Sequence, residues 1–139
     1  MIQKATNGLR FGKVIEWNTE THSAKVVFPG LGGMESDWIP VLVPFTTGNT
    51  AEAPLDTGTH VACLMSGEGS HVGVILGAFY DEGNHATAAD QDVANIAFND
   101  GMSILYDRKN HALTIDCPGN ITITAAGNIR LNAGRIDLN

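Results

Sequence analysis

The chain has 139 residues, 43% hydrophobic and 17% charged, a globular composition whose length suits one domain or a small domain with an appendage. Its formal charge of −7 is uneven: between Val41 and Asp100 lie eight acidic residues and no Lys or Arg, so this surface repels nucleic acid and anionic lipid headgroups. No stretch is apolar over about eighteen residues, and the N-terminus lacks an apolar signal segment, so neither a membrane-spanning helix nor a signal peptide is expected.

The first part of the chain is typical of β-structure. Runs of β-branched and aromatic residues alternate with turns rich in Gly, Pro, Asn and Asp, and no stretch has the periodicity of an amphipathic helix. Five such runs fit a small closed or partly open barrel, and the oligonucleotide/oligosaccharide-binding (OB) barrel is the commonest of these. We therefore predict an all-β protein in which domain 1–82 is an OB-like five-stranded barrel. The predicted strands are 11–18, 23–29, 37–45, 59–66 and 71–80.

A polar segment follows the predicted barrel. Residues 83–95 are poor in large apolar groups and predict a linker, with a short helical turn across its alanines as an option. After it, "MSILYD" and "HALTID" flank "RKN", which predicts a β-hairpin with Asn110 at its turn. The two cysteines, Cys63 and Cys117, have no CxxC partner, which favours buried free thiols in a reducing compartment.

The chain ends in a short glycine-phased repeat, "GNITITAAGNIRLNAGRIDLN". Apolar and polar residues alternate within each unit, so an extended chain places the apolar residues on one side. Three short strands cannot enclose a core, and a wet stripe of large aliphatic residues is an association surface. Closing three chains around a threefold axis buries these stripes against one another, which predicts a trimeric, intertwined β-helix or β-prism over residues 96–139. The predicted trimer core is Ile121, Ile123, Ile129, Leu131, Ile136 and Leu138.

Two other structures for the repeat stay open at this stage. The first is an antiparallel meander packed back onto the barrel, with turns at "AAGN" and "NAG". The second is an amyloid-like edge that is simply truncated.

Several short motifs occur in an order that resembles a known family. They are "GKVIEWNTETHSAKVVFPG", "ESDWIPVLVP", "APLDTGTHVACLM", "GVILGAFYD" and "FNDGMSILYDRKNHALTID". This ordered set, followed by the repeat, resembles the baseplate assembly protein V, or central tail spike, of contractile-tailed phages. The resemblance covers roughly residues 9–133. Its barrel motif residues are Trp38, Pro40, Gly58, Gly73 and Gly77, and its β-helix entry residues are Asp100, Gly101, Tyr106 and Asp107.

The resemblance implies a structural protein of the virion tail baseplate, without catalytic activity. Such a spike is a homotrimer that contacts the baseplate hub and tail tube, and it pierces the host outer membrane mechanically. Several family members bind iron at their tip through an H-x-H pair, but this chain has no H-x-H, so no metal or other cofactor is expected. We expect either a separate tip-capping protein or a chain that is a fragment lacking its tip.

Two alternative functions belong to other classes. A glycan-binding OB module trimerised by its tail would use Trp17 and Trp38 to stack on sugars, although a core or interface role also suits both. A tailspike depolymerase would need a larger β-helix with a carboxylate cleft. The segment "SGEGSHVG" has a phosphate-loop-like glycine spacing, but it leads into a strand and therefore predicts a hairpin turn.

Overall fold

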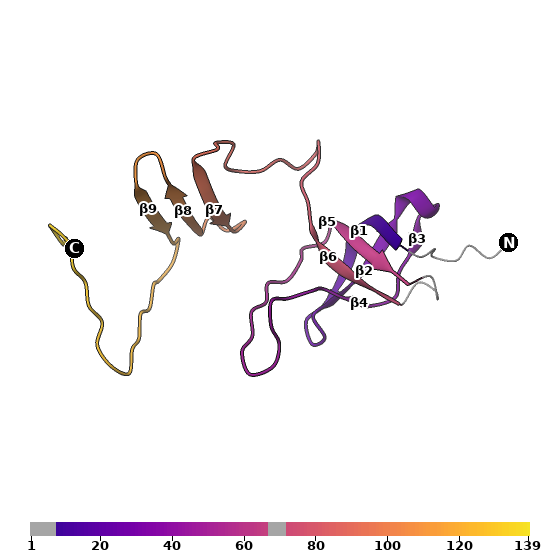
Figure 1. Ribbon diagram of the computed structural model, residues 1–139, viewed down its shortest axis with the longest axis horizontal. Helices are drawn as coiled ribbons and strands as arrows, with labels where there is room; N and C mark the ends of the chain where they lie inside the picture. Colours follow the sequence, from indigo (N-terminus) through magenta and orange to yellow (C-terminus); the bar gives the residue numbers. More distant parts are fainter. Residues whose placement is uncertain (1–7, 67–71) are drawn as a thin grey trace. The chain divides into compact units, whose positions relative to one another are not determined.

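The computed structural model describes residues 8–66 and 72–139. The chain divides into two compact units, the first ending at His85 and the second running from Ala86 to Asn139 (Figure 1). Both units consist of β-strands, with one 3₁₀ turn, η1 (Pro29–Leu31), so the all-β prediction is confirmed. Within the described ranges no helix is long and apolar enough to cross a membrane.

The first unit is built around one antiparallel sheet. In the order β3-β2-β1-β5-β6 each strand is hydrogen-bonded to its neighbours, and β4 also pairs with β2. The strands are β1 (Gly8–Asn18), β2 (Ser23–Phe28), β3 (Met34–Glu35), β4 (Ile39–Pro40), β5 (His60–Met65) and β6 (Gly73–Ala78).

The structure corrects the predicted strand list at two places. The segment 37–45 was expected to be one strand, but only β4 and a single parallel bridge between Val41 and Ile75 form there. Pro40 and Pro44 lack the backbone N–H that a continuous ladder needs. A short strand that is absent from the predicted list, β3, forms just before this segment. Six strands therefore replace five, and no continuous ladder closes the sheet into a barrel among the described residues.

The core of the first unit lies on one face of this sheet. Val14, Val26, Val61 and Ile75 each come from a different strand and are fully buried, as the period-two alternation of strands requires. Ser36 is buried among them, and its hydroxyl accepts a hydrogen bond from the Val26 N–H (2.8 Å). The complete apolar core is Val14, Ala24, Val26, Phe28, Ile39, Val61, Cys63, Met65 and Ile75.

The β5–β6 connection includes the phosphate-loop-like segment. Residues 67–71 lie outside the described part of the chain, and so do the turn predicted there and the first residue of the predicted strand 71–80.

The second unit holds a three-stranded antiparallel sheet. Its strands are β7 (Val93–Ala97), β8 (Ser103–Asp107) and β9 (Ala112–Asp116), in that order. The predicted hairpin is confirmed, because β8 pairs with β9 and Asn110 lies in the turn between them. The strand β7 begins inside the segment 83–95 that was expected to be a linker, and no helical turn forms over its alanines. An ion pair between Arg108 Nε and Asp92 Oδ1 (2.7 Å) holds the start of β7 to the end of β8.

Beyond β9 the chain runs on without strand pairing of its own. Residues 117–139 belong to no strand (Figure 1). Every residue from 118 onward is exposed. The meander alternative is therefore wrong, because its hairpin ladders do not form.

Candidate association surface

The strands of the second unit gather their apolar side chains on one face. Ile96, Ile104 and Ile115 lie directly opposite one another across β7, β8 and β9. The neighbouring row consists of Ala94, Tyr106 and Leu113. Rows two residues apart on a strand share a face, so the two rows form one continuous apolar surface. We call it the apolar face and define it as Ala94, Ile96, Ile104, Tyr106, Leu113 and Ile115.

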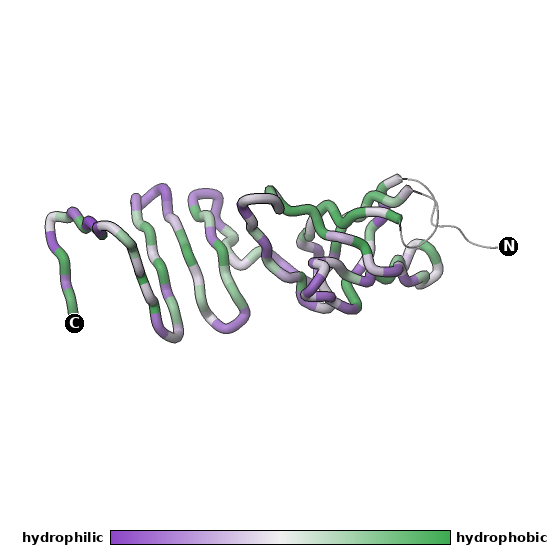
Figure 2. The backbone as a smooth tube through the Cα atoms, turned by 90° about the horizontal axis from the view of Figure 1, so that it is seen from below, coloured by the Kyte–Doolittle hydropathy of each residue, from purple (hydrophilic) through white to green (hydrophobic). Residues whose placement is uncertain are grey.

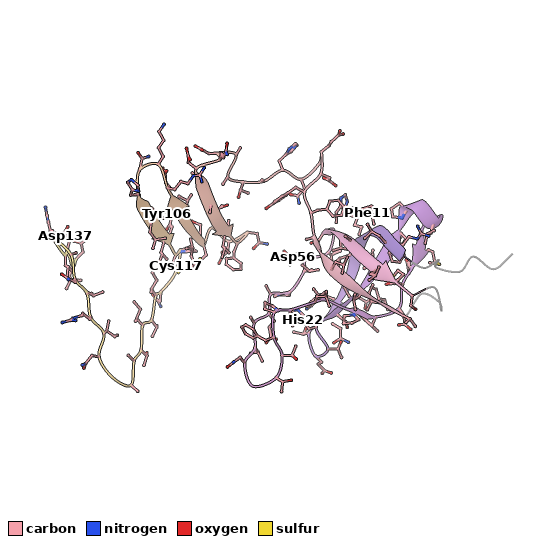
Figure 3. All side chains as sticks on the ribbon, viewed as in Figure 1. Phe11, His22, Asp56, Tyr106, Cys117 and Asp137 are labelled. Atoms are coloured by element: carbon pink, nitrogen blue, oxygen red, sulfur yellow. The ribbon has the colours of Figure 1, made fainter. Side chains whose placement is uncertain are left out.

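The apolar face is exposed among the described residues of the second unit. Ile96 is 60% exposed, Leu113 64% and Ile115 55%, while Ile104 and Tyr106 on the central strand are less exposed. Figure 3 shows Tyr106 on the central strand of this sheet. Buried aliphatic side chains of this size each contribute about 1.5–3 kcal/mol, so leaving a whole face in water forgoes a large stabilisation. A contiguous exposed apolar surface of this kind is a candidate site of association.

The opposite face of the same sheet is more polar. Asn95 and Ser103 project there, and so do Thr114 and Asp116 of β9. Val93 of β7 and Leu105 of the central strand are the larger apolar residues on that face, and both are only partly exposed. The two faces therefore differ in chemistry, and on β7 and β8 the apolar face is the more exposed of the two.

The predicted β-helix entry residues build the ends of this sheet. Asp100 and Gly101 lie in the turn between β7 and β8, where Gly101 has a φ of +102° that favours glycine. The Asp100 carboxylate accepts a hydrogen bond from the Met102 N–H (3.1 Å). Tyr106 belongs to the apolar face, and Asp107 ends β8. The structure thus gives each of the four residues a place in one hairpin system.

Asp107 organises the turn between β8 and β9. Its carboxylate accepts hydrogen bonds from Asn110 Nδ2 (2.8 Å), the Asn110 N–H (3.2 Å) and the Lys109 N–H (3.0 Å). The bond from the Asn110 side chain is the largest of the effects that lower the pKa of Asp107. His111 completes the turn with a φ of +55°, in the left-handed region. The β1–β2 turn is built in the same way. The Asn18 side-chain oxygen accepts hydrogen bonds from the Glu20 and Thr21 N–H groups, and His22 has a φ of +51°.

The terminal repeat contains further exposed aliphatic residues. Leu138 is 88% exposed, and Ile123 is 72% exposed. All six residues of the predicted trimer core are exposed in the single chain: Ile121, Ile123, Ile129, Leu131, Ile136 and Leu138. Their assignment to a trimer core stays a prediction, and the single chain offers them no cover.

The sequence singled out Tyr106 of the apolar face and, within the quoted β-helix entry motif, Leu113, but not Ala94, Ile96, Ile104 or Ile115. "NIA", "SILYD" and "ALTID" have the same period-two alternation as the repeat, so parity was a usable signal. What parity leaves open is the register that brings Ile96, Ile104 and Ile115 into one row.

The predicted barrel motif residues have distinct local roles. Gly58 has a φ of +96°, and Pro40 belongs to the short strand β4. A Cβ on Gly73 would come within 2.6 Å of the Leu64 carbonyl oxygen, whereas a Cβ on Gly77 would meet nothing within 4 Å. Trp38 is half-buried, and Lys25 Nζ lies 5.1 Å from the centre of its ring.

Gly12 is a further glycine that packing requires. A Cβ there would collide with the Val26 side chain and come within 2.8 Å of the Val27 carbonyl oxygen. Gly12 stands in the quoted "GKV" segment but was not singled out from the sequence. It lets β1 approach β2 closely, beside the buried Phe28.

Both cysteines are free thiols, and Cys63 is buried as expected, whereas Cys117 is not fully buried. Burial raises the pKa of the Cys63 thiol to about 11, and Cys117 is half-buried. In the described ranges, no group of three or more His, Cys, Asp or Glu side chains is placed to hold a metal ion.

Comparison with known proteins gives one informative match. No protein-family model matches the chain. The chain is 25% identical over 123 residues to the spike protein of Escherichia phage P2, which is 88% of this chain and 57% of the phage protein. The chain therefore spans little more than half the length of that relative. The match runs along most of the chain, as the motif resemblance does.

Proposed function

We propose that the chain is a structural subunit of the central spike of a contractile phage-type tail. The observation that carries this proposal is the uncovered apolar face of the second unit, which continues into the uncovered aliphatic residues of the repeat. Similarity to a phage spike protein over 88% of the chain supports the same role.

The proposed assembly is a homotrimer whose second units form a triangular β-prism. Each chain supplies one wall, with Ile96, Ile104 and Ile115 and the aliphatic residues of the repeat directed inward. A threefold axis suits this arrangement, because three identical walls cover one another's apolar rows and pair one another's strand edges. Figure 2 shows hydrophobic residues along the strands of the second unit and hydrophilic residues at the turns that join them.

The proposed action is mechanical. A prism with a dry core and paired edges is stiff, and contraction of the tail sheath would drive it through the outer membrane of the host. We propose that the first unit has an OB-like architecture and attaches the spike to the hub and tail tube of the baseplate. The spike would act without catalysis or a cofactor.

The tryptophans give little support to the alternative of a trimeric OB-fold glycan-binding module. Trp17 packs against the core and makes an edge-on contact with His22, with ring centres 4.9 Å apart. Trp38 has Lys25 over its ring. Saturable binding of lipopolysaccharide or capsule sugars that is lost in Trp38→Ala would favour this alternative.

Sedimentation of the full chain tests the proposed assembly. We expect three times the mass of the chain and resistance to SDS without heating, and a monomer would contradict the proposal. Ile129→Asp should break the trimer, because it places a carboxylate in the predicted core. Thr124→Asp is the matched control on the outer side of the repeat and should leave the trimer intact. Equal effects of the two substitutions would show that the predicted parity is wrong.

A further inference from the structure

The first half of β1 has a strand neighbour on one side only. Residues Gly8 to Lys13 pair with β5, but the ladder to β2 begins at the pair Lys13 and Val27. The ladder stops because Pro29, which follows β2, has no N–H to donate and begins the 3₁₀ turn η1. One edge of β1 from Gly8 to Gly12 therefore has no strand beside it in the described part of the chain.

The hydrogen-bonding groups on this edge belong to Leu9 and Phe11. The Val14 N–H donates to the Thr59 carbonyl (2.9 Å), and the Gly58 N–H donates to the Val14 carbonyl (2.8 Å), so Val14 faces the β5 side. Backbone groups alternate in direction along a strand. Leu9 and Phe11 are an odd number of residues from Val14, so their N–H and C=O groups face the open edge.

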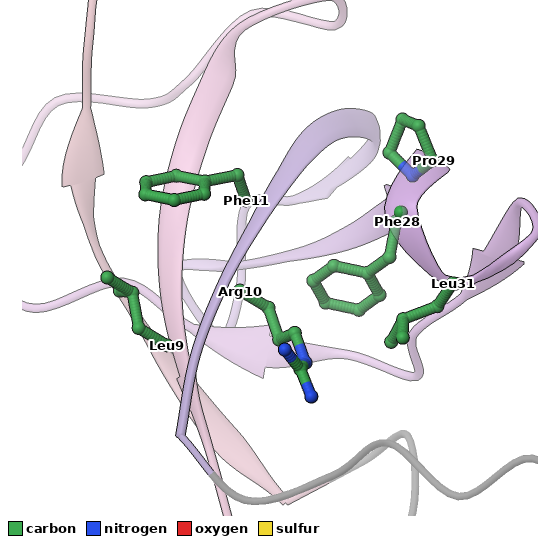
Figure 4. Close-up of a pocket in the computed structure, with 7 residues that line it drawn as sticks. Leu9, Arg10, Phe11, Phe28, Pro29 and Leu31 are labelled. Atoms are coloured by element: carbon green, nitrogen blue, oxygen red, sulfur yellow. The ribbon is translucent and has the colours of Figure 1, made fainter.

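A hollow of about 430 Å³ lies along this edge. It is lined by Leu9, Arg10, Phe11, Phe28, Pro29, Gly30 and Leu31. Figure 4 shows the Arg10 side chain leaving β1 on the side of Phe28 and Leu31, while Leu9 and Phe11 project from the other side of the strand. The hollow thus presents a strand edge, apolar walls and a cation together.

One donor of this cation lacks a partner. Arg10 is half-buried, its Nε is buried without a hydrogen-bond partner, and Arg10 forms no ion pair with any described residue. A buried donor without a partner is costly, and a carboxylate is the group that a guanidinium binds best.

We propose that the open edge of β1 is a docking site for an extended segment of a partner protein, which adds a strand beside Leu9–Phe11 and presents a carboxylate to Arg10. Two partner residues would exchange backbone hydrogen bonds with Leu9 and Phe11. The residue between them would lie opposite Arg10 in a non-hydrogen-bonded pair, where side chains are closest. The site therefore selects the pattern apolar, acidic, apolar.

The surroundings favour a polypeptide over a small carboxylate. Leu9 and Phe11 are 49% and 59% exposed, and Leu64, which lies opposite Leu9 on β5, is 48% exposed. The apolar residues of an added strand would cover Leu9 and Phe11, whereas a small acid bound at Arg10 would leave them wet. The proposal concerns the first unit and stands apart from the trimer of the second.

Short peptides test the proposal on the full chain. The probe is Ac-Thr-Val-Glu-Val-Thr-NH2, and its matched control has Gln in place of Glu. We expect shifts of the Leu9 and Phe11 backbone amide signals, and binding at least about tenfold tighter for the Glu peptide, since a hydrogen bond to a charged group is stronger than a neutral one. A third peptide, N-methylated at both valines, cannot pair with the edge and should not bind.

Variants of Arg10 complete the test. Arg10→Gln should make the Glu and Gln peptides bind equally, while Arg130→Gln, an exposed arginine in the second unit, should preserve the preference. If Arg10→Gln does not fold, the comparison of the three peptides on the unmodified chain decides.

Several results would overturn the proposal. Equal binding of the Glu and Gln peptides would show that Arg10 does not bind a carboxylate of the partner. Binding of the N-methylated peptide would show that the partner does not pair with β1 as an added strand. Binding of hexanoate without binding of any peptide would assign the hollow to a small acid. Loss of self-association in Arg10→Gln would assign the edge to a second copy of the chain, and no binding of any probe would leave the site without the proposed occupant.

Discussion

Ile104 on β8 lies directly opposite Ile115 on β9, and both project from a face of the sheet that stays exposed among the described residues of the second unit. This pair lies at the centre of the apolar face, with Ile96 of β7 beside it in the same row. In the proposed trimer this row would be buried against the matching rows of two other chains.

Ile115→Asp should prevent assembly, whereas Thr114→Asp should not. The two positions are neighbours on β9 and have similar backbone surroundings, but their side chains project from opposite faces of the sheet. A carboxylate at position 115 would be buried unpaired in the proposed trimer, at a cost of several kcal/mol. Sedimentation of both variants at equal concentration measures the effect. Trimers of normal stability in both variants would contradict the proposed inward orientation of the apolar face.

Gly73→Ala should destabilise the first unit, and Gly77→Ala should not. The new methyl group at position 73 would meet the Leu64 carbonyl oxygen at 2.6 Å and the Met65 sulfur at 2.5 Å, while position 77 is open. Overpacking costs about 1–3 kcal/mol, and replacing a glycine at an open position changes stability by up to about 1 kcal/mol in the favourable direction. Urea unfolding at one fixed protein concentration gives both values. A Gly77→Ala loss as large as that of Gly73→Ala would show that the described packing around β6 is wrong.

Cys63 should resist alkylation in the folded protein. Burial raises its pKa to about 11, so at pH 8 it carries roughly a few hundredfold less thiolate than an ordinary cysteine, and thiolate is the reactive form. Mass spectrometry after iodoacetamide treatment should find Cys63 unmodified while the chain is folded and modified after denaturation in urea. Cys117, which is only half-buried, is the internal reference. Rapid labelling of Cys63 in the folded chain would contradict its place in the core.

Asp107→Ala should lower the thermal unfolding midpoint at pH 7, and the difference from the unmodified chain should shrink in acid. The hydrogen bonds from Asn110 and Lys109 favour the charged carboxylate and lower the pKa of Asp107. A lowered pKa in the folded state contributes stability above the ordinary carboxyl pKa, and this contribution is lost as the pH falls below about 4 and through the folded value. Calorimetry at several pH values measures the difference.

The control for this experiment is Asp116→Ala, which removes an exposed carboxylate at the end of β9. Its midpoint should change little at pH 7. An Asp107→Ala difference that is equally large at pH 7 and in strong acid would show that the charge of the carboxylate is unimportant to the turn.

Local chemistry made much of the fold predictable. Strand positions follow from β-branched runs between turn residues, so β1, β2, β5, β6 and the β8–β9 hairpin were expected close to their observed bounds. The turn at Asn110 was expected for the same reason. The prediction of one strand over 37–45 was wrong because the prolines there lack the N–H groups that a continuous ladder needs. The strand β7 was missed because Val93–Ala97 is short and mixes apolar with polar residues, so it does not stand out from the polar segment before it.

The sequence by itself determined that the protein is all-β. It also determined that the aliphatic residues of the repeat alternate with polar ones and so lie on one side of an extended chain. Only the tertiary structure decided which strands pair and in which register. That pairing places Ile96, Ile104 and Ile115 in one row and leaves the edge of β1 open beside Arg10. It also makes the surroundings of Gly73 crowded and those of Gly77 open. The physical reason is that alternation assigns each side chain to a face of its own strand, whereas neighbours across strands depend on long-range hydrogen bonds that no local pattern specifies.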